Sequence, residues 1–357
     1  MTVSTGEALA KPTDRAVSWR QDLRCVGMIR FALATTIAML IAQAWSWPLS
    51  FIFPVFVLGI LSGGEPGPTL RETLEGMGYA LVAYSGTLVF VLFFLPFPIA
   101  FMLAYVLAVF LMSYHMHKGA PTLLILFMLI ALILYPILGS LDEGLSKYIA
   151  VSLTFSSVLA LLVVQLAHGL LPDPPGGERG IAPAHQPGYS PEAARRALKT
   201  TIVIALAMAA FVAFKWASYV VVLVYIGIMS LEGGLAEGKY NAKKYLLANT
   251  VGGLAAFPFY AVMVVVPEIY FFVVLTLVAM LLFAFPIFSG TPTAKYYGSA
   301  LTGLVILVSS SLGPGADIDV NVVKRVIFII LGGVYVIGAM SAVEKFLPER
   351  NDRQEAH

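Results

Sequence analysis

Long stretches without a charged side chain constrain this chain more than any other feature of its sequence. Asp, Glu, Lys and Arg are absent from residues 31–64, 76–114, 119–141, 148–172, 245–267, 269–294 and 296–316. An uncharged apolar stretch of about 18 residues or more is typical of a membrane-spanning helix. Charged residues make up only 12% of the 357 residues, about half of the share found in soluble domains. The pattern predicts a polytopic integral membrane protein and excludes soluble enzyme folds.

Proline, tryptophan and charged residues divide the apolar stretches into twelve segments. These are predicted at 31–46, 49–61, 76–95, 98–114, 121–138, 148–170, 198–214, 217–230, 245–265, 269–288, 295–312 and 323–343. In hydrocarbon a segment must satisfy its own backbone hydrogen bonds, which favours helices. The alternation of apolar and polar residues that is typical of a barrel strand is absent. We therefore predict an all-α integral membrane protein with about 12 transmembrane helices.

Short motifs recur in the same order in the two halves of the chain. Thr35-Thr36-Ile37 matches Thr200-Thr201-Ile202, Gly63-Gly64 matches Gly233-Gly234, Gly119-Ala120-Pro121-Thr122 matches Gly290-Thr291-Pro292-Thr293, and Leu171-Pro172 matches Leu347-Pro348. The matches predict two six-helix membrane repeats at 28–171 and 195–347. A cytoplasmic N-terminal segment (1–27), a Pro/Gly-rich cytoplasmic tether (172–194) and a cytoplasmic tail (348–357) complete the predicted organisation.

The placement of Lys and Arg predicts the orientation in the membrane. With a cytoplasmic N-terminus and six spans in each repeat, only Lys147, Lys215, Lys324 and Arg325 of the 22 Lys and Arg residues fall on the outer side. This distribution follows the positive-inside rule. Both termini are then cytoplasmic, and an even number of spans makes the two repeats parallel, related by an axis along the membrane normal.

The second segment of each half is the first candidate for a substrate path. Internal repeats are typical of transporters, whose sites lie at short or Gly/Pro-interrupted segments. The two segments have 13 and 14 residues, Pro54 is expected to interrupt the first, and each ends in a glycine pair beside a carboxylate, Glu65 or Glu232. One interpretation is a broken helix that lines the path, with Glu65 and Glu232 as proton carriers. The alternative is a plain cytoplasmic turn with solvated acids.

Cations at helix entries are candidate contacts for an anionic substrate. Arg30 and Lys199 precede the paired threonines of each half, so that Arg30, Lys199 and Thr200 form a candidate polar stripe. The alternative is snorkelling of the cations to the cytoplasmic interface. Lys295 lies in a loop of the second half, where it is either an anion contact or part of an interfacial anchor.

The third segment of the first half begins with a polar turn. Thr69 and Glu72 have the spacing of a capping box, and the nearby Arg71 adds a cation to the helix N-terminus, which suits a carboxylate ligand. Capping with positive-inside charge is the alternative. Glu75 is costly in the membrane unless it is paired, and Arg71, four residues earlier, is the candidate partner. Glu75 is therefore a candidate for proton coupling.

Other chemistry finds little support in the sequence. His115 and His117 are two residues apart, which places them on different helix faces, so we predict no metal site and keep His115 as a candidate proton relay. There is a single cysteine, Cys25. A phosphate-binding loop and a Ser/His/Asp order are absent, so we predict no enzyme activity, no cofactor and no nucleic-acid partner.

Three features resemble the fusaric-acid-resistance-like (FUSC) and aromatic acid exporter family of bacteria. They are the helix entries Arg30-Phe31-Ala32-Leu33-Ala34-Thr35 and Arg196-Ala197-Leu198-Lys199-Thr200, the short second helix ending in glycine, and the basic turn Gly67-Pro68-Thr69-Leu70-Arg71 before the third helix. The chain is similar to a compact, membrane-only subgroup, since it has a short tether where larger members carry soluble regions. The resemblance implies the bacterial inner membrane, proton-driven export of small aromatic carboxylates, and an HlyD-like membrane-fusion partner.

The expected function is therefore export of a small organic anion across the lipid bilayer. The candidate substrate contacts are Lys199, Arg71, Arg30, Lys295 and Thr200, and the candidate proton-coupling residues are Glu75, Glu65, Glu232 and His115. A passive channel, or a scaffold subunit of an export complex that transports nothing alone, is the alternative. The sequence leaves the substrate, the coupling ion and the oligomeric state open.

Overall fold

The computed structural model describes residues 23–47, 49–63, 67–173, 188–232, 238–311 and 318–346. The α-helices are α1 (Leu23–Trp45), α2 (Ile52–Leu61), α3 (Leu70–Phe94), α4 (Pro98–His117), α5 (Thr122–Gly139), α6 (Glu143–Leu170), α7 (Pro191–Ala213), α8 (Val220–Glu232), α9 (Gly238–Val265), α10 (Ile269–Ile287), α11 (Ala294–Ser311) and α12 (Ile318–Phe346). A short 3₁₀ turn, Ala217–Tyr219, precedes α8. Each predicted segment corresponds to one helix, so the prediction of an all-α fold is confirmed.

Several helices begin earlier than the uncharged stretches predict, because capping residues decide where a helix starts. The Asp142 carboxylate accepts a hydrogen bond from the Leu145 amide at the start of α6 (3.1 Å). The Ser190 hydroxyl oxygen accepts one from the Ala193 amide at the start of α7 (3.2 Å). At the start of α3, the predicted capping box of Thr69 and Glu72 is present. Such caps satisfy amides that have no partner within the helix.

Seven helices, α1, α3, α4, α5, α6, α7 and α10, are long and apolar enough to cross a membrane among the described residues. The second helix of the first half is much shorter. With ten residues, α2 rises only about 15 Å, against a hydrocarbon core of about 30 Å. The prediction that Pro54 interrupts this helix is wrong. Pro54 lies in the first turn of α2, where the missing amide costs no helical hydrogen bond.

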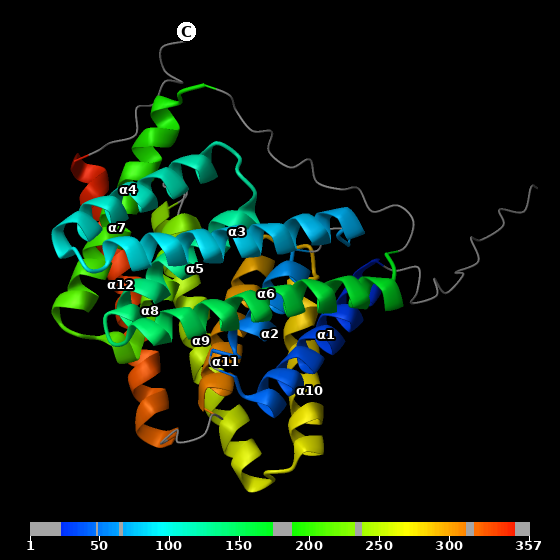
Figure 1. Ribbon diagram of the computed structural model, residues 1–357. Coiled ribbons are helices and arrows are strands. Elements are labelled where there is room, and N and C mark those ends of the chain that lie inside the picture. Colours follow the sequence, from blue (N-terminus) through cyan, green and yellow to red (C-terminus); the bar gives the residue numbers. More distant parts are fainter. Residues whose placement is uncertain are drawn as a thin grey trace, which may run out of the picture.

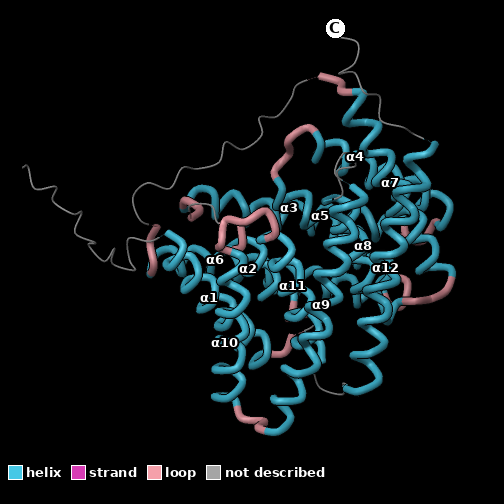
Figure 2. Tube along the Cα trace, turned by 180° about the vertical axis from the view of Figure 1, so that it is seen from behind, coloured by secondary structure: helices cyan, strands magenta, loops and turns pink. Residues whose placement is uncertain are grey.

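The packing of the helices repeats between the two halves. α3 packs on α5 as α9 packs on α11, and α2 contacts α6 as α8 contacts α12. The first helix of each half packs on the fourth helix of the other, in the pairs α1–α10 and α7–α4. Figures 1 and 2 show α1 and α10 on one side of the molecule and α4 and α7 on the other. The two halves are therefore intertwined.

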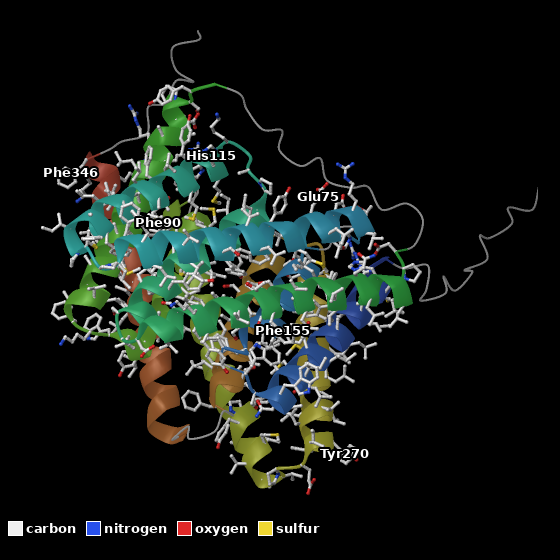
Figure 3. All side chains as sticks on the ribbon, in the orientation of Figure 1. Glu75, Phe90, His115, Phe155, Tyr270 and Phe346 are labelled. Atoms are coloured by element: carbon white, nitrogen blue, oxygen red, sulfur yellow. The ribbon has the colours of Figure 1, made fainter. Side chains whose placement is uncertain are left out.

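The short helices α2 and α8 lie in the middle of the bundle with α5 and α11 (Figure 1). α2 contacts α11, and α5 contacts α8, so these four helices join the two halves at their centre. The outer helices α3, α4 and α10 expose large apolar side chains, among them Val89, Leu103 and Phe285. Tyr270 at the start of α10 also projects outward in Figure 3. Outer faces of this kind are those of an all-α membrane protein, in which lipid covers them.

The closest helix crossing gives a first prediction. A Cβ atom on Gly252 of α9 would lie 1.8 Å from the carbonyl oxygen of Ala300 on α11. We expect Gly252→Ala to push the two helices apart and to destabilise the protein by about 2 kcal/mol or more. Thermal unfolding in detergent measures the effect. Gly338→Ala on α12 is the control, because a Cβ there meets no atom within 4 Å. Equal stability of the two variants would contradict the prediction.

Candidate functional site

A cavity of about 1280 Å³ lies between the two halves. Residues of α1, α2, α5, α8 and α11, and of the turn between α10 and α11, line it. Ser62 and Gly63 at the end of α2 are among them, so the end of the short second helix of the first half faces this space. Glu65 falls outside the described residues. Glu232 ends α8, and its side chain is likewise not among those described.

Small residues on α11 explain why the cavity lies beside α2. Gly298, Ser299 and Thr302 of α11 line it, and a Cβ on Gly298 would just reach Ser62, at 4.0 Å. In the matched repeat, the residue of α5 that corresponds to Gly298 is Phe127, which is buried and packs edge-on against Phe56. The aligned position thus carries a glycine beside the cavity in one repeat and a buried ring, packed within its own half, in the other.

One end of the cavity carries its charge. Arg24 and Arg30 of α1 line this end, and Asp173, just after α6, is the one acidic residue among the described lining residues. The Arg24 guanidinium lies against the turn between α10 and α11, 3.2 Å from where a Cβ on Gly290 would stand. Arg30 is paired with Asp173, and Arg24 is a second cation in the described lining of this end. The rest of the wall is mainly aliphatic, from α2, α5 and α8.

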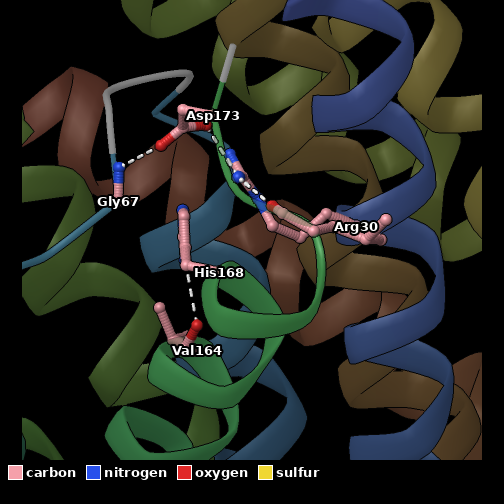
Figure 4. Close-up of polar contacts among 6 residues, drawn as sticks. Arg30, Gly67, Val164, His168 and Asp173 are labelled. Carbon is pink, nitrogen blue, oxygen red and sulfur yellow. Dashed lines mark hydrogen bonds and ion pairs between the residues drawn. The ribbon is translucent and has the colours of Figure 1, made fainter. Parts of the chain in front are cut away.

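Arg30 is held in place by its hydrogen bonds (Figure 4). Its Nη1 donates to the Asp173 carboxylate at 2.7 Å and to the Leu171 carbonyl oxygen at 3.0 Å. The other Asp173 carboxylate oxygen accepts from the Gly67 amide at 2.6 Å. Only 6% of Arg30 is exposed. The contact joins the start of α1 to the chain before α3 and the chain after α6.

Gly67 has a steric role in this contact. A Cβ atom at this position would lie 2.1 Å from the imidazole ring of His168, whose Nδ1 is 2.9 Å from the Val164 carbonyl oxygen on the same helix. The glycine therefore lets the chain before α3 approach α6 closely enough to reach Asp173.

Partial burial raises the pKa of the Asp173 carboxyl, but the Gly67 amide and the Arg30 guanidinium outweigh that effect and hold the pKa below its ordinary value of 3.8. Because the pKa of Asp173 is lower in the folded than in the unfolded protein, ionised Asp173 stabilises the fold. This stabilisation is fully present above pH 3.8 and is lost as the pH falls through the lower pKa of the folded state. We expect the stability difference between wild type and Asp173→Asn to be constant from about pH 7 to 5 and to shrink at lower pH. Thermal unfolding over this range measures it. A difference that shrank near neutral pH would contradict the assignment.

Lys199 and Thr200 lie in the second repeat, away from the cavity lining. Lys199 is 1% exposed on α7, and its ammonium nitrogen has no hydrogen-bond partner among the described residues. The buried Thr200 hydroxyl donates to the Ser230 carbonyl oxygen of α8 at 3.5 Å, near the limit of a hydrogen bond. A buried cation in a membrane helix is costly unless it is paired or solvated. Substrate binding by Lys199 and Thr200 stays a prediction.

Arg71 and Glu75 form the ion pair that their spacing predicts. The Arg71 Nε lies 2.8 Å from a Glu75 carboxylate oxygen on α3, with 88% and 45% of the two side chains exposed. Figure 3 shows Glu75 on the outside of the bundle. Neither residue lines the cavity. Their roles in substrate binding and proton coupling stay predictions.

Substitution of Glu75 distinguishes a structural role of the exposed Arg71–Glu75 pair from a role in proton coupling. Because such pairs contribute at most about 1 kcal/mol to stability, we expect Glu75→Gln to fold and insert like wild type, and a purely structural pair would leave the transport rate unchanged. Proteoliposomes with an imposed pH gradient provide the measurement. Loss of gradient-driven transport, with counterflow retained, would instead establish Glu75 as the coupling residue that the sequence suggests.

The two remaining candidates lie apart from each other. His115 is exposed near the end of α4, beside the Tyr114 ring (Figure 3). The neighbouring Lys118 donates to the Gly188 carbonyl oxygen at 2.6 Å. This hydrogen bond connects the end of α4 to the chain before α7. Lys295 begins α11 next to the cavity-lining Ala294, and its side chain is not among those described. Arg30 is thus the one predicted contact whose described side chain lines the cavity.

Sequence reasoning missed Arg24 and Asp173. A signal for Asp173 is present in the repeat alignment. The matched pair Leu171-Pro172 and Leu347-Pro348 is followed in each copy by an acid, Asp173 or Glu349, while Arg30 aligns with Arg195. The recurrence marks Asp173 as a position to consider but does not pair it with Arg30, and Glu349 lies outside the described residues.

Comparison with known proteins relates part of the chain to one protein family. Residues 27–167, which run from α1 into α6, match the model of a membrane-protein family described as a protein of unknown function (DUF2955). This family is loosely related to the FUSC-like exporters. No curated protein and no solved structure matches the chain.

Proposed function

We propose that this protein is a transporter of the bacterial inner membrane that exports small organic carboxylates with the energy of the proton gradient. The observation that carries the proposal is the cavity between the two halves, with its arginines at one end and its apolar walls. Substrate sites of repeat-built transporters lie at the repeat interface, and small-molecule sites are mostly apolar with a few placed polar groups.

The chemistry of the cavity suits an organic anion. A guanidinium binds carboxylates through directed, charge-assisted hydrogen bonds. Arg30 makes this interaction with the Asp173 carboxylate at 2.7 Å, so a substrate carboxylate would share or replace that partner, and Arg24 lines the same end. Aliphatic side chains of α2, α5 and α8 would contact the apolar body of the substrate.

The position of the charges supports export. The charged end of the cavity lies near the start of α1 and the end of α2. In the orientation that the positive-inside rule predicts, both are cytoplasmic. An anion would therefore reach the arginines from the cytoplasm.

Transport by the purified protein tests the proposal. Proteoliposomes that contain the full chain, with an imposed pH gradient, should accumulate labelled benzoate or 4-hydroxybenzoate faster than protein-free liposomes, which take up only the neutral acid by permeation, and a protonophore should abolish the excess. Benzamide, the neutral analogue of benzoate, should not accumulate. Flux that only equilibrates and ignores the protonophore would indicate a passive channel. Absence of flux for every carboxylate would overturn the proposal in favour of a scaffold subunit.

A further inference from the structure

The cavity is larger than a single-ring acid needs. Its volume of about 1280 Å³ exceeds the range of about 300–1000 Å³ that is usual for sites of drug-sized ligands. A benzoate-sized ligand would leave most of this space without contact, and each missing contact forfeits dispersion energy. The volume therefore favours a bulkier or longer ligand.

The cavity is also elongated, with its charge at one end. Its lining follows α2 from Ile52 to Gly63, a length of about 15 Å. Arg30 lies at the end near Gly63, because the Asp173 carboxylate binds both Arg30 and the amide of Gly67, four residues after Gly63. At the other end, the described lining residues Leu49, Phe51 and Ile52 are apolar. A matching ligand has one anionic head and an apolar body that extends away from it.

The walls favour a flexible aliphatic body over a flat ring. Branched aliphatic side chains from three helices line the body of the cavity, among them Val55, Ile130, Leu134, Val224 and Ile228. Two of the lining rings are already engaged with other rings, Phe56 with Phe127 at 5.3 Å and Phe288 with Phe31 at 5.7 Å between centroids. Such walls offer many small contacts to an alkyl chain and few free faces for stacking.

We infer that the ligand of this cavity is an amphiphilic carboxylate with an extended alkyl chain, such as decanoate, whose head lies at Arg24 and Arg30 and whose chain lies along α2. The inference rests on the proposed function for the placement of the substrate in the cavity. It names a substrate class that differs from single-ring aromatic acids.

Protection of a cysteine in the cavity tests the inference without transport. Gly59 of α2 lines the cavity, and a Cβ there meets no atom within 4 Å. Gly59→Cys in a Cys25→Ser background, in nanodiscs of zwitterionic lipid, is labelled with a water-soluble maleimide in the presence of butanoate, hexanoate, octanoate, decanoate or benzoate. Each added methylene should lower the half-protecting concentration by about three- to fourfold, and benzoate should protect weakly.

Three controls separate binding from partition into lipid. Leu141→Cys, in the exposed turn between α5 and α6 and outside the cavity lining, should be labelled and show no protection. Decanol, which lacks the charge, should protect Gly59→Cys less than decanoate, and Arg24→Gln should remove this difference. Nanodiscs with anionic phospholipid distinguish the two sources of an acyl chain. Protection by phospholipid alone, with no further effect of decanoate, would overturn the inference.

The outcomes separate this inference from the proposed function. Protection that is independent of chain length, or a Gly59→Cys thiol that the maleimide cannot reach, would overturn the alkyl-chain assignment. Accumulation of benzoate in proteoliposomes would then still support export. Chain-length-dependent protection without accumulation of any carboxylate would support the ligand assignment and overturn the proposed transport.

Discussion

Gly59→Trp is expected to abolish transport while the protein still folds and inserts. Gly59 is exposed to the cavity, and a Cβ at this position meets no atom within 4 Å, so an indole ring can enter the cavity without displacing the backbone. The ring would occupy the space beside α2 through which the ligand must bind. We expect the initial rate of carboxylate uptake into proteoliposomes to fall by at least about tenfold, as for a site that is already filled.

Gly86→Trp is the matched control for this substitution. Gly86 is also an exposed helical glycine whose Cβ would meet no atom within 4 Å, but it lies on the outer helix α3. The same ring should there enter the lipid and leave transport near the wild-type rate. Equal activity of the two variants would mean that the cavity is not on the transport path. Loss of both activities, with correct insertion, would point to a general effect of the added ring.

Arg30→Gln is expected to have the largest effect on stability. The substitution leaves the Asp173 carboxylate, 22% exposed, without its cation, and it removes a hydrogen bond to the Leu171 carbonyl oxygen. Breaking a largely buried ion pair by removing one partner costs roughly 3 kcal/mol. Thermal unfolding of the purified protein in detergent should show this loss.

Two further variants separate the roles of the pair. Arg71→Gln breaks another arginine–carboxylate ion pair, Arg71–Glu75, that is exposed on α3, and it should cost less than about 1 kcal/mol. The double variant Arg30→Gln/Asp173→Asn removes both charges and should recover part of the stability. It should not recover carboxylate binding, because Arg24 alone then faces the anion. Full recovery of binding would limit Arg30 to a structural role.

The packing of helices from one half against helices of the other limits how the cavity can open to one side of the membrane and then to the other. α1 packs on α10 and α7 on α4, so neither half of the chain is a separate packing unit. A rigid rocking of one half against the other would break these contacts. Movement of the central helices α2, α5, α8 and α11 within the outer frame would keep them, and these helices also line the cavity.

The helices of this protein are determined locally, and the sequence therefore predicts them. In hydrocarbon each apolar segment satisfies its own backbone, and capping residues such as Thr69 and Ser190 lie next to the helices that they start. The repeat, the short second helices and the Arg71–Glu75 pair are also visible in the sequence, since they depend on order or on spacing within one helix.

The candidate site depends on contacts between distant segments, and only the tertiary structure decided it. Arg30 and Asp173 are 143 residues apart, and the sequence shows neither their contact nor its junction with Gly67. Residues of both halves line the cavity, Gly59 of α2 and Gly298 of α11 among them. A missing side chain becomes an opening only when its neighbours fail to fill it, and that is a property of packing.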